Sequence, residues 1–453
     1  MLRRKIEKEI TRWIETSKKA LLIDGARQVG KTYIIRSVLE ERNCSFIEFN
    51  LLKSPEIVGL IAKSETVEDM VTNLSLFTDK PFNKGETFVF FDEIQEYKEL
   101  TTKIKFWVDE GSFRYVFSGS LLGVELKNLK SAPVGYLKTL TMYPLDFEEF
   151  LQIYNFTGEL KQSLYQSFRA RTPVNDTVHK KMMQIFNTYL NVGGMPAAVS
   201  KFNETHSLED VIAEHEDIVT QYKKDFTRYE SEEKKPYLTQ IYDLIPAELN
   251  ASNKRFNYSD IKKGLRYERS EDNFVWLSGA GVALPVFNVT EPSVPLLLNE
   301  KSSLFKLFLA DIGMLTTMYG KATKMQVLSD NPNINNGALY ENVVAQELKA
   351  HGFKLYYYNS KKYGELDFVI EYKGRVLPIE VKSGKGYQRH SALSNVMDIS
   401  NYSIEEAFVL TNYNVKTKGN LVYYPIYMLM FITDENIKLP KMDLFDLSDL
   451  AEK

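Results

Sequence analysis

The sequence predicts a multi-domain α/β protein whose first domain is built on a parallel sheet. Short apolar runs alternate with helical periodicity up to about Leu140, and a glycine-bounded turn directly follows the first of these runs. Helical periodicity dominates the middle of the chain, and strand patterns return from about Leu355 onward. With 453 residues, the chain is long enough for about two to four domains.

The composition indicates an ordinary globular protein and excludes several kinds of site. Apolar residues make up 44% and charged residues 26%, as in ordinary globular proteins, and the net charge of −3 argues against a general polyanion binder. Cys44 is the single cysteine, which excludes an internal disulfide and a cysteine-based zinc site. Neither a leader peptide nor an apolar stretch of membrane-spanning length is recognisable, so we expect a cytoplasmic protein without a membrane partner.

Four apolar runs predict buried parallel strands in the first domain, because each ends in turn or polar residues. They are Ala20–Ile23, Ser45–Phe49, Thr87–Phe91 and Arg114–Phe117. A basic amphipathic helix is expected over residues 1–19, and a further helix is expected from Pro144 to about Tyr154. The first domain is taken to span residues 1–158. Farther on, Val282–Val289 reads as a strand, and Pro285 within it indicates a sheet edge.

The glycine-bounded turn GARQVGKT predicts a phosphate-binding loop, because it fits the pattern G-x-x-x-x-G-K-[ST] between a strand and a helix. Lys31 is expected to reach the β- and γ-phosphates and the Thr32 hydroxyl to bind Mg²⁺. A strand-to-helix turn with an exposed lysine is the structural alternative. The residues expected to wrap the phosphates are Gly25, Ala26, Arg27, Gln28, Val29, Gly30, Lys31 and Thr32.

Polar residues follow two later strands. Asp92 and Glu93 end the third run, where Asp92 can bind Mg²⁺ beside the phosphates and Glu93 can polarise the attacking water. A solvated acidic turn is the alternative. The fourth run ends in Ser118-Gly119-Ser120, and we expect a hydroxyl there, that of Ser120, to sense the γ-phosphate or to position water. A plain Ser–Gly turn fits this segment equally well.

These motifs resemble a prokaryotic family of AAA+-type ATPases. GARQVGKT, FFDEIQ, FSGSLLGVEL and MYPLDFEEFL carry the resemblance, and YLNVGGMP, from Tyr189 to Pro196, extends it. The resemblance implies ATP, Mg²⁺ and ATP hydrolysis. It also implies a helical region over 159–245, a winged-helix-like region over 246–325 and a restriction-endonuclease-like PD-(D/E)XK domain over 326–453. Such ATPases often place an arginine against the γ-phosphate; Arg27 and Arg114 are candidates between which the sequence does not choose.

The segment Gly364–Ser383 predicts a β-hairpin around a two-residue turn, Lys373-Gly374. If Tyr372 faces Arg375, then Asp367 lies opposite Glu380 and Glu365 opposite Lys382, all on one face. Like charges in register destabilise a sheet, so a divalent cation is expected between Asp367 and Glu380. The other face is predicted to be the core side, formed by Leu366, Phe368, Ile370, Leu377, Ile379 and Val381.

The polar hairpin face resembles the metal site of the PD-(D/E)XK fold. Lys382 would orient or activate a metal-bound water. A glutamate on the preceding helix often joins such a site, and Glu341 matches the family motif better than Glu347. The expected ligands of this second Mg²⁺ or Mn²⁺ are therefore Glu341, Asp367 and Glu380. Two alternatives stay open: a solvated face with a Glu365–Lys382 ion pair, and an inherited nuclease fold that no longer cuts.

A basic and aromatic segment in the winged-helix-like region predicts contact with nucleic-acid phosphates, and a solvated face for protein contact fits it equally well. Its residues are Lys254, Arg255, Phe256, Tyr258, Lys262, Lys263, Arg266, Tyr267 and Arg269. The predicted function is a Mg²⁺-dependent ATPase coupled to DNA handling, with metal-dependent cleavage as a further hypothesis. The alternative is a nucleotide-dependent switch whose C-terminal domain binds DNA or protein. DNA, a protein partner and a second copy of the chain remain open as partners.

Overall fold

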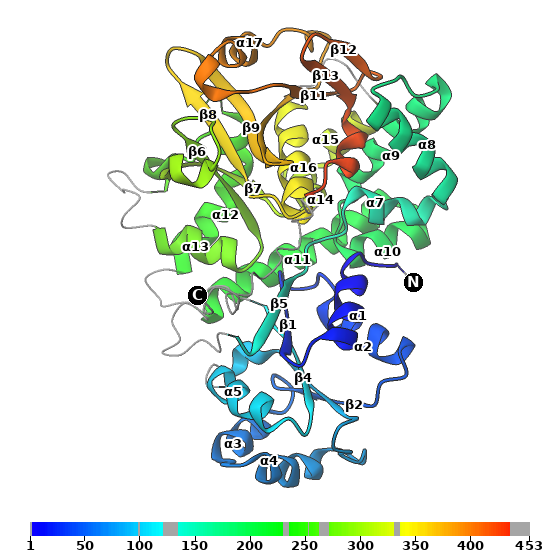
Figure 1. Ribbon diagram of the computed structural model, residues 1–453, viewed down its shortest axis with the longest axis vertical. Coiled ribbons are helices and arrows are strands. Elements are labelled where there is room, and N and C mark those ends of the chain that lie inside the picture. Colours follow the sequence, from blue (N-terminus) through cyan, green and yellow to red (C-terminus); the bar gives the residue numbers. More distant parts are fainter. Residues whose placement is uncertain are drawn as a thin grey trace, which may run out of the picture.

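The computed structural model describes residues 2–97, 100–120, 135–229, 235–251, 253–261, 271–329 and 336–434. A five-stranded sheet with its helices forms one end of the molecule and an eight-stranded sheet the other, with helices between them (Figure 1). The predicted α/β class and the N-terminal parallel sheet are confirmed.

The N-terminal sheet is parallel throughout, in the order β2-β3-β4-β1-β5. Its strands are β1 (Ala20–Asp24), β2 (Phe46–Asn50), β3 (Phe88–Asp92), β4 (Arg114–Ser118) and β5 (Leu137–Thr141). The four predicted runs match β1 to β4 within one residue at each end. The fifth strand was missed because its sequence, LKTLT, is only partly buried and forms no apolar run. Since the strands are parallel, their carboxyl ends meet at one edge of the sheet.

Helices cover both faces of this sheet, and the side chains of β1 show it. Leu21 and Ile23 belong to one core cluster and Ala20 and Leu22 to another, as alternation along a doubly buried strand requires. The first cluster includes residues of α1 (Ile6–Thr16) and α2 (Lys31–Glu41). The second includes residues of α3 (Pro55–Lys63), α4 (Val67–Leu74) and α5 (Leu100–Glu110).

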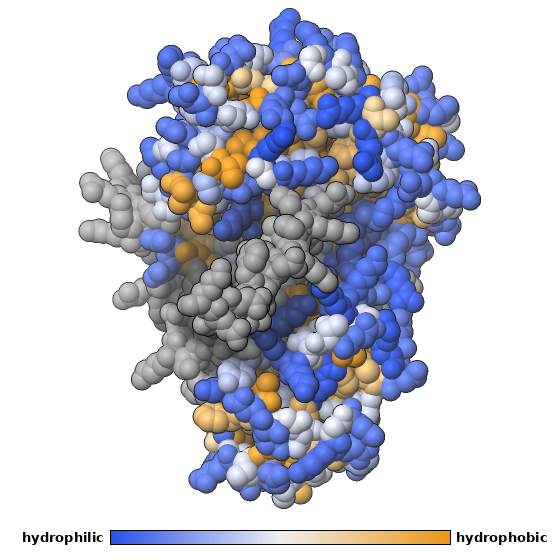
Figure 2. Space-filling model, in the orientation of Figure 1, coloured by the Kyte–Doolittle hydropathy of each residue, from blue (hydrophilic) through white to orange (hydrophobic). Residues whose placement is uncertain are grey.

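The first core cluster extends from the N-terminal sheet into the C-terminal half of the chain, through the buried residues of a further set of helices. They are α7 (Phe147–Phe150), α8 (Gly158–Ala170), α9 (Asp176–Val192), α10 (Pro196–Thr205), α11 (Leu208–Tyr229), α12 (Lys235–Asn250), α13 (Glu271–Gly279), α14 (Ile312–Met318), α15 (Lys321–Leu328) and α16 (Gly337–Ala350). Within the described ranges, none of the helices has the length and apolar character needed to cross a membrane. The face shown in Figure 2 is mostly hydrophilic, with hydrophobic residues in small separate groups.

The C-terminal sheet is mixed, in the order β12-β13-β11-β10-β9-β8-β6-β7. Its strands are β6 (Ala283–Val289), β7 (Glu300–Leu309), β8 (Tyr356–Ser360), β9 (Gly364–Tyr372), β10 (Arg375–Lys382), β11 (Ala407–Thr411), β12 (Lys416–Lys418) and β13 (Leu421–Pro425), and α17 (Ser391–Met397) joins β10 to β11. Because β6 and β7 belong to the region 246–325 and pair with the strands that follow, this sheet crosses the predicted boundary between residues 325 and 326.

The expectation that Pro285 marks a sheet edge was wrong in one respect. β6 lies between β7 and β8, so it is an interior strand. Only Phe287–Val289 pair with β8, however, and Pro285 lies opposite Leu307 of β7 alone. The missing N–H of proline is therefore accommodated in the part of β6 that has a neighbour on one side.

Candidate functional site

The predicted phosphate-binding loop has the expected strand–turn–helix form. β1 ends at Asp24, the turn runs through Gly25 to Gly30, and α2 begins at Lys31. Gly25 and Gly30 have φ of 139° and 96°, values that side chains disfavour. A Cβ on Gly25 would lie 2.2 Å from the carbonyl oxygen of Met142. The tight turn therefore depends on glycine, and it leaves the first N–H groups of α2 at the carboxyl edge of the sheet.

The ammonium group of Lys31 lies inside this turn. Its Nζ donates to the carbonyl oxygens of Gly25, at 3.0 Å, and Ala26, at 2.8 Å. Burial lowers the pKa of Lys31 to about 8, although Glu93 and Asp92 oppose that shift. The cation is thus held among the backbone groups that are expected to surround a phosphate chain.

Three polar side chains converge on the carboxylate of Asp92. The Thr32 hydroxyl donates to Oδ1 at 2.9 Å, and the Ser118 hydroxyl donates to the same oxygen. Asn50 Nδ2 donates to Oδ2 at 2.9 Å. Because β2, β3 and β4 are parallel neighbours, their last residues, Asn50, Asp92 and Ser118, come together. A hydroxyl and a carboxylate are oxygen ligands of the kind Mg²⁺ uses, so Thr32 and Asp92 fit that ion.

Glu93 and Ser120 occupy different environments. Glu93 has φ of 60°, in the left-handed region that non-glycine residues rarely adopt, and its carboxylate accepts from the Gln95 side-chain amide. Such an outlier at the end of a strand beside the turn is typical of functional positions. Ser120 is buried, and its hydroxyl has no hydrogen-bond partner among the described residues. The serine that contacts Asp92 is Ser118, the last residue of β4.

Helix α11 lies against the phosphate-binding loop. The Arg27 guanidinium forms an ion pair with Asp225, and Gln28 Nε2 donates to Gln221 Oε1 at 2.5 Å. The Tyr222 hydroxyl donates to the carbonyl oxygen of Arg27 at 3.1 Å. The sequence did not reveal these contacts. Arg27 thus lies within the turn, but its guanidinium is already paired with the carboxylate of Asp225.

A second segment approaches the turn from the C-terminal half of the chain. Gly281, between α13 and β6, has φ of 72°, and a Cβ there would lie 2.9 Å from the backbone nitrogen of Ala26. The backbone of this connection therefore packs directly on the phosphate-binding loop.

The other candidate arginine, Arg114, does not face the loop. It begins β4, whereas the loop follows the end of the parallel neighbour β1. Its guanidinium donates to the carbonyl oxygens of Ile14 at 2.7 Å and Ser17 at 2.8 Å, and lies 4.5 Å from the ring centroid of Trp13. Arg114 therefore fastens α1 to the opposite edge of the sheet, and its candidacy for the γ-phosphate was wrong.

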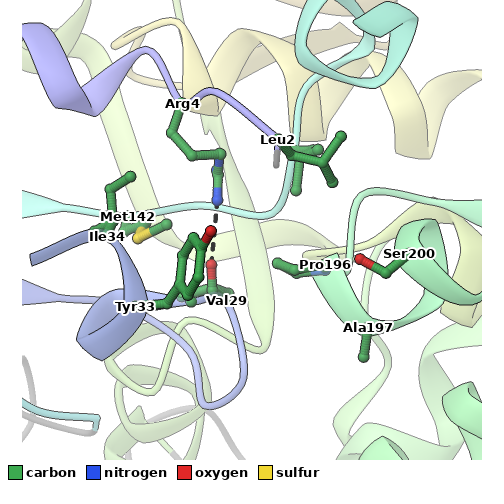
Figure 3. A pocket seen from close by; sticks show the side chains of 11 residues that line it. Leu2, Arg4, Val29, Tyr33, Ile34, Met142, Pro196, Ala197 and Ser200 are labelled. Carbon is green, nitrogen blue, oxygen red and sulfur yellow. Dashed lines mark hydrogen bonds between the residues drawn. The ribbon is translucent and has the colours of Figure 1, made fainter. Parts of the chain in front are cut away.

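A largely apolar cavity of about 310 Å³ adjoins the loop (Figure 3). It lies between the start of α2, the N-terminal segment and the start of α10. Arg4 points into it and donates to the carbonyl oxygen of Val29 at 3.1 Å. The residues that line the cavity are Leu2, Arg4, Val29, Gly30, Tyr33, Ile34, Met142, Leu145, Pro196, Ala197 and Ser200.

The turn Gly193-Gly194 positions the α10 wall of this cavity. Leu145 N–H donates to the carbonyl oxygen of Gly194 at 2.7 Å, and Gly194 N–H donates to Asp311 Oδ2 at 2.6 Å. Asp311 is buried at the start of α14, and burial raises its pKa to about 6. The cavity wall is therefore fastened to both halves of the chain.

The C-terminal half contains a second, polar cavity of about 560 Å³. It brings together Glu341 of α16, Asp367 of β9 and Lys382 of β10, as the sequence predicted. The residues that line it are Lys254, Gly337, Glu341, Asp367, Val381, Lys382, Ser383, Gly384, Gly386, Tyr387 and Arg389. Glu347, the other glutamate considered, lies elsewhere and accepts from the Phe147 N–H and the Tyr189 hydroxyl.

The predicted hairpin register is correct from Tyr372–Arg375 to Phe368–Ile379 and ends there. Asp367 is not the ladder partner of Glu380, because Asp367 Oδ2 instead accepts the N–H of Val381 at 2.9 Å. A register irregularity between β8 and β9 at this point also shifts side chains between faces. The predicted single core face was therefore wrong: Leu366 packs in a different cluster from the other five residues, Phe368, Ile370, Leu377, Ile379 and Val381.

Lysines accompany the acidic residues of this cavity. Glu341 contacts Lys254 and lies 3.8 Å from Lys306, and Glu365 pairs with Lys306 at 2.6 Å. The ladder between β9 and β10 ends before Glu365 and Lys382, so their expected pairing was wrong, and Lys382 instead pairs with Glu380 at 2.6 Å. Burial, followed by the charge of Asp367, raises the pKa of Glu380 to about 8. In the described part of the chain, no three acidic, histidine or cysteine side chains are arranged to hold a metal together.

The predicted nucleic-acid surface is described only in part. Phe256 is buried and packs against Phe274 and Phe305, so it belongs to the core and not to a binding face. Lys254 faces the polar cavity. The remaining basic segment lies outside the described residues; it comprises Lys262, Lys263, Arg266, Tyr267 and Arg269.

Several solved structures are similar to this chain. The Walker-type ATPase PabY2304 of Pyrococcus abyssi is 17% identical, over 70% of this chain and 96% of that one, with a TM-score of 0.44. Cdc6p from Pyrobaculum aerophilum is 14% identical, over 72% and 92%, with a TM-score of 0.26. Pif1 helicase from Candida albicans is 12% identical, over 41% and 48%, with a TM-score of 0.23. These TM-scores are too low to carry an argument about function.

Family models match three parts of the chain. Residues 183–325 and 336–429 match two domains of unknown function, DUF8612 and DUF4143. No curated protein matches the chain. Residues 17–151 match an AAA domain, and this stretch contains the phosphate-binding loop, Asp92 and Glu93. The match and the geometry of the loop together support a P-loop ATPase domain at this end of the protein.

Proposed function

We propose that this protein hydrolyses ATP with Mg²⁺ at the loop between β1 and α2. The observation that carries the proposal is the contact between Thr32 and Asp92 directly beside the ammonium of Lys31. The N–H groups of the loop bind phosphate oxygens, and Lys31 neutralises their charge. Thr32 and Asp92 would hold Mg²⁺, which supplies charge neutralisation at the phosphates when bound. Ser118 orients Asp92, and Glu93 accepts a proton from the attacking water.

The apolar cavity beside the loop supports a nucleotide, rather than a simple phosphate, as the ligand. Val29 and Gly30 belong both to the loop and to the cavity wall, so a group attached to the bound phosphates can enter the cavity. Tyr33 and Pro196 provide apolar surface on two sides of it, which suits the flat ring of a purine (Figure 3).

Lys31→Ala is expected to abolish phosphate release from ATP, because the substitution removes the cation that stabilises the β- and γ-phosphates. The loss should be at least about 100-fold. Lys63→Ala is the matched control, since Lys63 is exposed at the end of α3, and it should keep full activity. Phosphate release under single-turnover and steady-state conditions measures both. Full turnover by Lys31→Ala would remove the ATPase assignment.

We further propose that the C-terminal domain handles DNA and has a nuclease-like metal site. The supporting observation is that Glu341, Asp367 and Lys382 border one cavity, together with Arg389. Carboxylates are suitable ligands for Mg²⁺ or Mn²⁺, and the lysine and arginine suit a phosphodiester. These residues fit a metal in kind, although Glu341 and Glu380 are each paired with lysine. The alternative is a module that binds DNA or protein without cutting.

Asp367→Ala is expected to abolish cleavage of plasmid or branched DNA in the presence of Mg²⁺ or Mn²⁺, because it removes a central metal ligand. Lys382→Ala should do the same through loss of the activated water. Glu291→Ala, an exposed acid outside the cavity, should cut like the wild type. Gel analysis of cut DNA measures all four proteins. If wild type does not cut with either metal but binds DNA in a salt-dependent way, the binding-module alternative holds.

A further inference from the structure

Lys254 reaches the C-terminal carboxylates from outside the helix and strands that bear them. Lys254 lies in the segment between α12 and residues 258–260. Two hydrogen bonds, one to β7 and one to α12, hold this segment in place. Phe256 N–H donates to the carbonyl oxygen of Phe305 at 3.0 Å, and Asn257 N–H donates to Glu248 Oε2 at 3.1 Å. The backbone thus places the Lys254 ammonium against Glu341.

Glu341 is enclosed between two ammonium groups. Its Oε1 contacts Lys254, and its Oε2 lies 3.8 Å from Lys306 Nζ. The Glu341 side chain is only 4% exposed, so solvent screens these charges weakly. A divalent cation that binds Glu341 would have to lie close to both lysines, and like charges at such separations repel strongly in a buried site.

The two lysines differ in whether their side chains can move away from Glu341. Lys306 is fully buried on β7, pairs with Glu365 at 2.6 Å and lies 5.1 Å from the ring centroid of Tyr357. Lys254 is 24% exposed and lines the open cavity. Only Lys254 can therefore turn into solvent without leaving a strand or opening the core.

We propose that Lys254 acts as an internal cation that closes the C-terminal carboxylate site to divalent metal. The site opens when the Lys254 side chain withdraws, because the cavity then loses one positive charge while all four of its nearby carboxylates remain. Those carboxylates are Glu341, Glu365, Asp367 and Glu380. This inference rests on the proposed C-terminal metal site.

The test is a calorimetric titration of the full chain with Mn²⁺ in the absence of nucleotide. Lys254→Met keeps the length of the side chain and removes its charge, so the variant should bind Mn²⁺ at least about tenfold more tightly than wild type. Adding Asp367→Asn to this variant should abolish the gain in Mn²⁺ affinity. That loss would assign the additional Mn²⁺ binding to the cavity. Lys321→Met is the matched control: its lysine pairs with Glu209 on the surface and should not affect binding.

Two further variants separate charge from packing. Lys254→Arg preserves the cation and should bind Mn²⁺ as weakly as wild type, whereas Lys254→Gln should resemble Lys254→Met while keeping a donor for Glu341. Thermal unfolding identifies the variants that fold. If wild type binds Mn²⁺ as tightly as Lys254→Met, and both lose binding with Asp367→Asn, the metal site stands and the closing role of Lys254 is overturned. If no folded variant binds Mn²⁺ at the cavity, the metal site itself is overturned.

Discussion

Glu93→Gln is expected to reduce the rate of ATP hydrolysis by about 100- to 10,000-fold while leaving ATP affinity nearly unchanged. Glutamine has the same shape as glutamate but cannot accept a proton from the attacking water. Glu93 lies directly after Asp92, beside the loop and not within it, so the binding of the phosphates should persist. Single-turnover phosphate release measures the chemical step, and equilibrium binding of a fluorescent ATP analogue measures affinity.

Glu86→Gln provides the control for this experiment, because Glu86 is an exposed acid in the turn before β3. Its activity should equal that of wild type. Full turnover by Glu93→Gln would show that another group accepts the proton. Loss of ATP binding would show that the charge of Glu93 is needed to bind the nucleotide and not only to accept a proton.

Gly194→Ala should cause the largest loss of stability, lowering the free energy of unfolding by more than about 3 kcal/mol or preventing folding. The added Cβ would lie 2.0 Å from the carbonyl oxygen of Leu145, a backbone atom that cannot move aside by rotating a side chain. Relief of this clash would break the hydrogen bonds from Leu145 to Gly194 and from Gly194 to Asp311. Chemical denaturation followed by circular dichroism measures the change.

Gly158→Ala is the contrasting substitution. Gly158 is the first residue of α8, and a Cβ there would meet no heavy atom within 4 Å. The variant should be as stable as wild type or more stable by up to about 1 kcal/mol, because alanine restricts the unfolded chain. Equal stability of the two alanine variants would contradict the close packing of Gly194 on Leu145.

Local patterns predicted much of the N-terminal domain. The strands could be located because they are buried on both faces and therefore read as continuous apolar runs. The loop motif, together with the acid at the end of β3, predicted that Thr32 and Asp92 would meet. β5 escaped detection because edge strands with exposed side chains lack such a run.

Contacts between distant segments could not be predicted in the same way. Arg27 and Asp225 are 198 residues apart, and no local periodicity links them. Lys306 belongs to none of the motifs that the sequence offered, yet its side chain is fully buried and lies between Glu341 and Glu365. At the hairpin, the register held for five pairs and failed at Asp367, where a side chain replaced a ladder hydrogen bond.

The close approach of Gly281 to Ala26 means that the phosphate-binding loop is supported by residues encoded far beyond its own domain. An excised fragment ending near residue 158 would lack both this support and α11, with its partner for Arg27. Such a fragment should therefore bind nucleotide poorly even if its sheet folds. Conversely, nucleotide bound to the whole chain should slow proteolysis and amide exchange in the connection between α13 and β6, because opening that connection would disturb the occupied loop.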